Sequence, residues 1–270
     1  MKLHIGISPC PNDTFIFDAI YSKKINISPF EIEFIFEDVE TLNQLALDSR
    51  LDIIKLSYAN YFNVTDEYIM LRSGGALGKG VGPLLIAKKK MDLSALENLQ
   101  IAIPGIHTTA SFLLSYAFPQ LKNKKVYLFS EIEKAVLDEA VDAGVIIHEN
   151  RFTYQEKGLV KLMDLGEYWE TQTHLPIPLG GIAIRRELNE TMQKEMNDLI
   201  RKSIEYNQNN YPSLSPFITS HAQEMSEEVM RQHIELYVNN FSLDVGDEGI
   251  KAVEKMAAVI GKSSLQKLFI

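Results

Sequence analysis

The sequence is poor in cysteine, since Cys10 is the only one among 270 residues. A single cysteine cannot form an internal disulfide, and the cysteine pairs of a structural zinc site are missing as well. The N-terminus reads MKLHIGISPCPND and lacks the long apolar stretch and small-residue cleavage site of a secretory signal. No run reaches the roughly 20 apolar residues of a membrane span. These absences predict a cytoplasmic protein that does not cross a membrane.

Positive charge is also scarce. There are 27 Lys and Arg residues against 36 Asp and Glu residues, which gives a net charge of -9. Because nucleic-acid binding depends on clustered positive charge, no nucleic-acid partner is expected. A small anion is not excluded, since backbone N–H groups at a helix start and one or two cations bind it locally.

Short apolar runs alternate with amphipathic stretches over the first 150 residues. Such alternation predicts an α/β fold with parallel sheets covered by helices on both faces. Strands are predicted at 2–8, 31–37, 52–57, 83–89, 100–105, 125–129 and 144–148. Helices are predicted at 14–23 with Asn12 or Asp13 as cap, after Asp38, at 58–62, at 108–118, after a Ser130–Glu133 capping box, and over most of the chain beyond about residue 187.

Two segments resemble crossings between lobes, one at Lys88–Met91 and one at Pro176–Pro178. They divide the chain into an outer lobe of residues 1–89 and 176–270 and an inserted lobe of residues 90–175. Both pieces have ordinary domain sizes. The prediction is a two-lobed α/β protein with a central ligand cleft.

Polar side chains follow four of the predicted strands. They are the SPCPND segment, Lys55 with Ser57, His107 with Thr108 and Thr109, and the HENR segment that begins at His148. Ligands of open parallel sheets bind beyond the carboxyl ends of the strands. If the two lobes face each other, all four clusters line one cleft.

Each of these residues has a structural alternative. Thr108 and Thr109 lie at a helix start that suits a carboxylate, yet Thr108 could simply cap that helix. Ser57 could begin a helix or donate to a ligand, and Lys55 could offset ligand charge or point at solvent. His148 follows a buried apolar strand, where a histidine is either a structural hydrogen-bonding group or a general base near neutral pH.

Several short motifs fail on inspection. HENRF begins like the zinc motif H-E-x-x-H but has Phe152 at the second ligand position. SGGALGKGVGP matches neither a P-loop nor a dinucleotide fingerprint, so we interpret it as a loop where the backbone approaches something closely, or as structure ahead of the hinge. Cys10 lies between two prolines and is a weak candidate nucleophile, because a buried lone cysteine is usually inert.

Longer motifs carry a resemblance that spans nearly the whole chain. They are SPCPNDTFIF, EDVETLNQ, KLSYANY, RSGGALGKGVGP, PGIHTTASFLL, GVIIHENRFTY, LPIPLGGIAIRR and YVNNFSLDVGDEG. In the same order they resemble the 1,4-dihydroxy-6-naphthoate synthases of the futalosine route to menaquinone. The resemblance implies a type II periplasmic-binding-protein-like fold and a lyase that needs no cofactor. It further implies cleavage of cyclic dehypoxanthine futalosine to 1,4-dihydroxy-6-naphthoate.

The resemblance also implies roles for individual residues. His148 corresponds to the proposed proton acceptor of the family, and the substrate contacts correspond to Lys55, Leu56, Ser57, Thr108 and Thr109. Two alternatives remain open: a solute-binding protein for small anions that does no chemistry, and the chorismate dehydratase of the same pathway. The sequence does not give the oligomeric state, so a homodimer stays open too.

Overall fold

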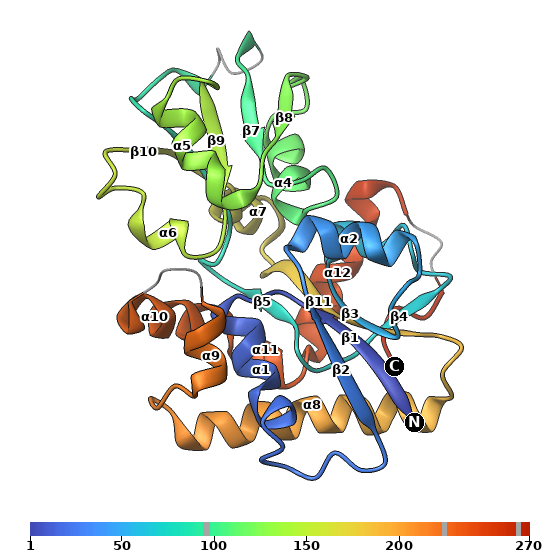
Figure 1. Ribbon diagram of the computed structural model, residues 1–270. Helices are drawn as coiled ribbons and strands as arrows, with labels where there is room; N and C mark the ends of the chain where they lie inside the picture. Colours follow the sequence, from blue (N-terminus) through green and yellow to red (C-terminus); the bar gives the residue numbers. More distant parts are fainter. Residues whose placement is uncertain (94–97, 223–225, 263–265) are drawn as a thin grey trace. The chain divides into compact units, whose positions relative to one another are not determined.

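The computed structural model describes residues 1–93, 98–222, 226–262 and 266–270. Its contacts divide the chain into unit 1, residues 1–78 and 178–270, and unit 2, residues 79–177. Each unit has its own sheet and helices (Figure 1). From the sequence, the first crossing between lobes is expected at 88–91. In the structure the preceding strand, 84–87, pairs with strands of unit 2 and belongs to that unit.

The sheet of unit 1 is mixed. Its strand order is β2 (Glu31–Phe36), β1 (Lys2–Ile7), β3 (Ile53–Ser57), β11 (Ile177–Arg185) and β4 (Tyr68–Met70), and β5 (Ala76–Gly78) also pairs with β11. β1 runs parallel to β2 and β3, whereas β11 runs antiparallel to β3 and β4. The expectation of wholly parallel sheets was therefore wrong, because β11 returns to this sheet in the opposite direction.

β11 was not predicted as a strand. It contains Gly180 and Gly181, and glycine weakens an isolated strand. The structure shows why both are present. A Cβ at Gly180 would lie 2.9 Å from the carbonyl oxygen of Leu56, and one at Gly181 would lie 2.3 Å from the methyl carbon of Met70. The absence of a side chain at Gly180 and Gly181 therefore lets the Leu56 carbonyl and the Met70 side chain pack directly against the backbone of β11.

The helices of unit 1 are α1 (Pro11–Tyr21), α2 (Val39–Leu47), α3 (Tyr58–Tyr61), α8 (Glu190–Asn210), α9 (Pro216–His221), α10 (Glu227–Tyr237), α11 (Asn240–Leu243) and α12 (Gly246–Ile260). α2 begins as predicted, because the Asp38 side chain accepts hydrogen bonds from two backbone N–H groups of its first turn. α1 begins earlier than predicted, at Pro11. Its N-cap is Cys10, so Asn12 and Asp13 lie inside the helix and do not cap it.

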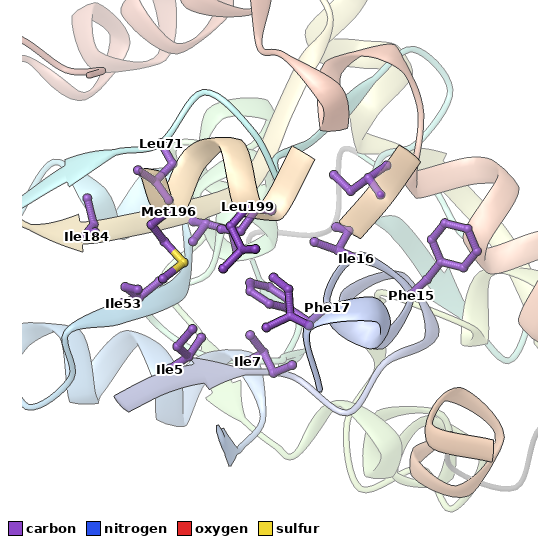
Figure 2. Close-up of a cluster of buried hydrophobic side chains, with 14 of the residues drawn as sticks. Ile5, Ile7, Phe15, Ile16, Phe17, Ile53, Leu71, Ile184, Met196 and Leu199 are labelled. Atoms are coloured by element: carbon purple, nitrogen blue, oxygen red, sulfur yellow. The ribbon is translucent and has the colours of Figure 1, made fainter. Parts of the chain in front are cut away.

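Apolar side chains cover both faces of the unit 1 sheet. Leu3, Ile5 and Ile7 alternate along β1 and pack in one core with residues of α1 and α8 (Figure 2). Gly6 faces the other way, since a Cβ there would lie 3.0 Å from a methyl carbon of Leu42 on α2. Helices on both faces, as predicted, thus hold the strand ends of unit 1 in place.

Unit 2 contains a second mixed sheet. Its strand order is β10 (Val160–Asp164), β6 (Leu84–Ala87), β9 (Ala143–Ile146), β7 (Ile101–Ile103) and β8 (Lys124–Val126). β7 runs parallel to β8 and β9, and β6 runs antiparallel to β9 and β10. The helices are α4 (Thr109–Ala117), α5 (Ile132–Leu137), α6 (Asn150–Thr153) and α7 (Leu165–Thr173), with a 3-10 turn, η2, at Phe129–Glu131.

The predicted capping box of unit 2 was wrong. α5 begins at Ile132, and its N-cap residue, Glu131, makes no side-chain capping bond. Glu133 is buried, and its carboxylate binds Lys157 and Asn150 from elsewhere in the unit. A local pattern was therefore overruled by tertiary partners.

Part of the glycine-rich loop does approach another backbone closely, as interpreted from the sequence. A Cβ on Gly82 would lie 2.3 Å from the Cα of Gly166 at the start of α7. Ahead of Gly82, Ala76–Gly78 forms strand β5, which differs from the loop expected there. Among the described residues, no helix is both long and apolar enough to cross a bilayer.

Candidate active site

In unit 1 the segment after β1 folds around the carboxylate of Asp13. The backbone N–H and hydroxyl of Ser8 donate to Asp13 Oδ2 at 3.2 and 2.7 Å, and Asn12 Nδ2 donates to Oδ1 at 2.8 Å. All three side chains are buried. Because β1 is neighbour and parallel to β3, this carboxylate lies at the sheet edge where β3 also ends.

Lys55 of β3 completes this group. Its Nζ donates to Asp13 Oδ1 at 2.7 Å, and the two side chains are 8% and 2% exposed. Of the two alternatives left by the sequence, exposure to solvent is therefore wrong. The ammonium neutralises Asp13, so the net local charge of the pair is close to zero.

Ser57 is held by a residue that the sequence analysis did not select. Its backbone N–H donates to Asn43 Oδ1 at 2.9 Å, and Asn43 Nδ2 donates to Ser57 Oγ at 3.1 Å. Asn60 in turn donates to the Asn43 carbonyl at 2.9 Å. Asn43 is fully buried on α2, where only its polarity within an apolar helix face could have drawn attention.

Leu56 lies between these two polar residues along β3. Successive strand residues point to opposite faces, so its side chain lies opposite to those of Lys55 and Ser57. It is fully buried. Leu56 can therefore offer a ligand only its backbone, whereas Lys55 and Ser57 share one face.

Asn12, which the sequence places both as a candidate helix cap and in the polar SPCPND segment, provides a further polar atom. Its Oδ1 is buried and makes no hydrogen bond within the described residues. Buried polar atoms normally have a partner, so an oxygen in this position is a candidate acceptor for a ligand or water donor. It belongs to the same group of side chains as Asp13 and Ser8.

In unit 2 the paired threonines begin α4. Thr108 is the N-cap: its hydroxyl accepts from Ser111 N at 3.1 Å and donates to the carbonyl of Gly105 at 2.8 Å. The capping role is thus observed, and the Thr108 hydroxyl proton is already donated. Thr109 is the first residue of the helix, and its side chain is buried.

His148 follows β9 in the left-handed backbone region, with φ of 57°. Its side chain is half-buried, and its ring meets the Phe129 ring edge-on at 5.2 Å between centroids. β9 and β7 are neighbouring parallel strands, so His148 and the two threonines come from adjacent strand ends at the same sheet edge. This part of the predicted grouping is observed within unit 2.

The residues after His148 have separate tasks. Burial raises the pKa of the Glu149 carboxyl, and the nearby Glu133 carboxylate raises it further. Asn150 Nδ2 donates to Glu133 Oε2 at 2.7 Å. Arg151 binds Asp164 at 2.9 Å and the carbonyls of Gly80 and Gly82, so its guanidinium stabilises the loop.

The sequence matches a known family over almost its full length. The matching family model is described as menaquinone biosynthesis and covers residues 3–262. The chain belongs to this menaquinone biosynthesis family. Within the described residues, no three His, Cys, Asp or Glu side chains are grouped so as to hold a metal ion.

Two relatives are named 1,4-dihydroxy-6-naphthoate synthase. The protein of Thermus thermophilus is 48% identical over 256 residues, which cover 95% of this chain and 93% of the relative. The protein of Streptomyces coelicolor is 41% identical, over 93% of this chain and 90% of the relative. Both relatives therefore align with this chain along essentially the whole sequence.

Solved structures bear out the predicted fold. A crystal structure of a protein from Archaeoglobus fulgidus aligns with a TM-score of 0.89 at 33% identity, over 96% of this chain and 98% of the other. The alkanesulfonate-binding protein of Xanthomonas axonopodis aligns with a TM-score of 0.73 at 12% identity, over 99% and 95%. The second likeness concerns the fold alone, which is confirmed as periplasmic-binding-protein-like.

Proposed function

We propose that this chain is a 1,4-dihydroxy-6-naphthoate synthase, a lyase that converts cyclic dehypoxanthine futalosine to 1,4-dihydroxy-6-naphthoate. The observation that carries the proposal is the 48% identity, over 95% of the chain, to a relative that bears this name. The sequence motifs at the strand ends support it, because they fall on the polar groups described above.

The first step that we propose is removal of a carbon-bound proton of the substrate by the neutral ring of His148. Carbon–carbon or carbon–oxygen cleavage follows with loss of a three-carbon fragment, and aromatisation of the new ring supplies driving force. A general base of this kind contributes about 10²–10⁴-fold to the rate. The position of His148 beyond a buried strand, with a half-buried ring, suits that role.

We propose substrate contacts for residues of each unit, considered separately. In unit 2 the start of α4 at Thr108 and Thr109 would receive the substrate carboxylate, with the first-turn backbone dipoles favouring negative charge. In unit 1 Ser57 would orient the substrate, and Leu56 would contribute through its backbone. Lys55 is proposed to contact the substrate as one member of its pair with Asp13, because its ammonium is already bound there.

One assay separates the proposal from its alternatives. The purified protein is incubated with cyclic dehypoxanthine futalosine, and with chorismate in a parallel reaction, while naphthoate absorbance is followed. We expect a naphthoate chromophore with the first substrate only. Turnover of chorismate would identify the dehydratase instead, and binding without turnover of either would identify a solute-binding protein.

His148→Asn tests the base. Asparagine adopts the left-handed backbone region readily, so the substitution removes the imidazole without forcing the chain into a new conformation. His174→Asn is a matched control, because His174 also has a positive φ, of 58°, and ends α7 in the same unit. We expect a 10²–10⁴-fold loss of kcat in the first variant, estimated from the usual contribution of a base, and unchanged kcat in the second. Near-normal turnover by folded His148→Asn protein would refute the assignment.

The remaining expectations from the sequence stay predictions. They are a cytoplasmic location, a reaction without a cofactor, and a small anionic substrate. The homodimer is likewise untested and would be settled by sedimentation of the purified protein.

A further inference from the structure

The backbone at His148 needs support from its surroundings. Its φ of 57° lies in a region that residues with a Cβ seldom adopt. Such conformations persist where neighbouring structure fixes them, and they concentrate at functional sites. The support must come from groups close to His148 in the chain or packed against it.

The two residues that follow Glu149 are both anchored by side-chain bonds. Arg151 is held by Asp164, on the end of β10, at 2.9 Å. Asn150 is held by Glu133, on α5, through a hydrogen bond of 2.7 Å to Oε2. These anchors fix the chain directly after the turn, while β9 in the middle of the sheet fixes the chain before it.

Glu133 is an unusual residue for such a position. Its side chain is 3% exposed, and burying a carboxylate is costly unless a cation compensates. Lys157 supplies that cation, with Nζ 2.5 Å from the same oxygen, Oε2, and its own side chain 49% exposed. Since α5 does not use Glu133 as a cap, helix formation does not explain the residue.

We propose that Glu133, with Lys157 as its counter-ion, is a positioning residue that acts through Asn150 to hold His148 in place. The proposal rests on the catalytic role proposed for His148. Glu133 Oε2 accepts from both Asn150 and Lys157, so one buried oxygen ties α5, the start of α6 and the segment beyond α6 together. Loss of that oxygen would free Asn150 and let the His148 turn relax.

Three variants test the proposal by steady-state kinetics. Glu133→Leu removes both bonds and fills the space, whereas Glu133→Gln keeps a side-chain oxygen that can still accept from Asn150. Lys134→Met is the control, because Lys134 is the next residue on α5 and forms an exposed ion pair with Asp138. We expect kcat to fall about 10–100-fold in Glu133→Leu, from misplacement of the base by a fraction of an ångström to an ångström. KM should change less than about threefold, Glu133→Gln should recover most of the loss, and the control should equal the parent protein.

A double-mutant cycle with Asn150→Ala shows whether Glu133 acts through Asn150. Coupled residues are non-additive, so Glu133→Leu combined with Asn150→Ala should cost no more than the larger single change. Additive losses would overturn the proposal. So would a Glu133→Leu protein whose melting temperature falls while its kcat is unchanged.

An activity-independent measurement separates this proposal from the proposed function. The edge-on contact between the His148 and Phe129 rings, 5.2 Å between centroids, should give a nuclear Overhauser effect in the parent protein. We expect it to weaken in Glu133→Leu and Asn150→Ala and to persist in Glu133→Gln and Lys134→Met. If His148→Asn retained turnover, the catalytic role of His148 would be refuted. The nuclear Overhauser effect between His148 and Phe129 would still test whether Glu133 positions His148. An undiminished effect in both Glu133→Leu and Asn150→Ala would overturn the positioning role itself.

Discussion

The ammonium nitrogen of Lys55 lies 2.7 Å from carboxylate oxygen Oδ1 of Asp13, and both side chains are almost fully buried. Lys55 lies on β3, and Asp13 lies in the first turn of α1, the helix that follows the neighbouring parallel strand β1. Asp13 also accepts from Ser8 and Asn12, so the pair forms the centre of a small polar network. In a buried pair, each charge depends on the other to offset its loss of hydration.

Asp13→Asn should destabilise the protein strongly. It would leave the Lys55 ammonium buried beside a neutral amide, and breaking a buried pair typically costs about 3–5 kcal/mol of unfolding free energy. Urea unfolding followed by circular dichroism measures this value. The double variant Asp13→Asn with Lys55→Met should recover part of the loss, since no unpaired charge remains. A double variant less stable than Asp13→Asn alone would contradict this account.

Two substitutions distinguish the capping role of Thr108 from a role in substrate binding. Thr108→Val removes the hydroxyl that accepts from Ser111 N, which should lower stability by about 1 kcal/mol, whereas Thr108→Ser keeps that bond. If the residue only caps α4, Thr108→Ser leaves KM unchanged. A KM increase in Thr108→Ser at unchanged melting temperature would show that the threonine methyl group contacts the substrate.

Glu149 gives a pH dependence of stability with a defined sign. Its pKa is raised by burial, so between the ordinary value near 4.5 and the raised folded value the folded protein binds more protons than the unfolded chain. Stability contributed by the neutral carboxyl is therefore present below this window and is lost as pH rises through it. The melting temperature of Glu149→Gln minus that of the parent protein should therefore increase from pH 4 to pH 8.

Glu139 offers the opposite case for the same experiment. Lys88 lowers the pKa of this exposed carboxyl through a hydrogen bond and charge attraction. The stability that the ionised Glu139 carboxylate contributes is present above its ordinary pKa and is lost as the pH falls through the lowered pKa of the folded protein. Glu139→Gln should therefore show a small relative change of opposite sign to that of Glu149→Gln. The same sign in both variants would contradict the assigned causes.

Gly82→Ala should destabilise unit 2 by about 1–3 kcal/mol, the usual cost of overpacking. The new methyl group would meet backbone atoms of Gly166, which have no rotamer through which to move away. Gly158→Ala is the control, because no atom of the described residues lies within 4 Å of a Cβ there, which leaves the positive φ of 80° as the source of strain. Differential scanning calorimetry compares the two. An equal or smaller loss in Gly82→Ala would show that the close approach is not required.

Local patterns predicted those parts of the fold that local forces determine. α2 was predicted because Asp38 and the apolar spacing after it are a complete helix start, and β2 because its side chains alternate. Strand-end clusters at Ser57 and His148 were found by the same reasoning. β11 could not be found this way, since Gly180 and Gly181 make sense only against neighbouring strands.

The same limit applies to the site. Asn43 and Glu133 each lie on a helix, and neither has a sequence neighbour that shows its task. Asn43 acts on Ser57 of β3, and Glu133 acts on Asn150 of α6. The expected substrate class came from the resemblance to the family, because residue types and their spacing alone do not specify a substrate.

The position of β11 has a consequence for the order in which the protein can be assembled during translation. β11 lies between β3 and β4, yet the ribosome makes β3 and β4 first and then about 100 residues of unit 2 before it reaches β11. All the strand pairings of unit 2 fall between residues 84 and 164, so that sheet can close while the sheet of unit 1 is still open. Until residue 185 has left the exit tunnel, the nascent chain carries the exposed edge of β3, which makes chaperone binding at that stage advantageous.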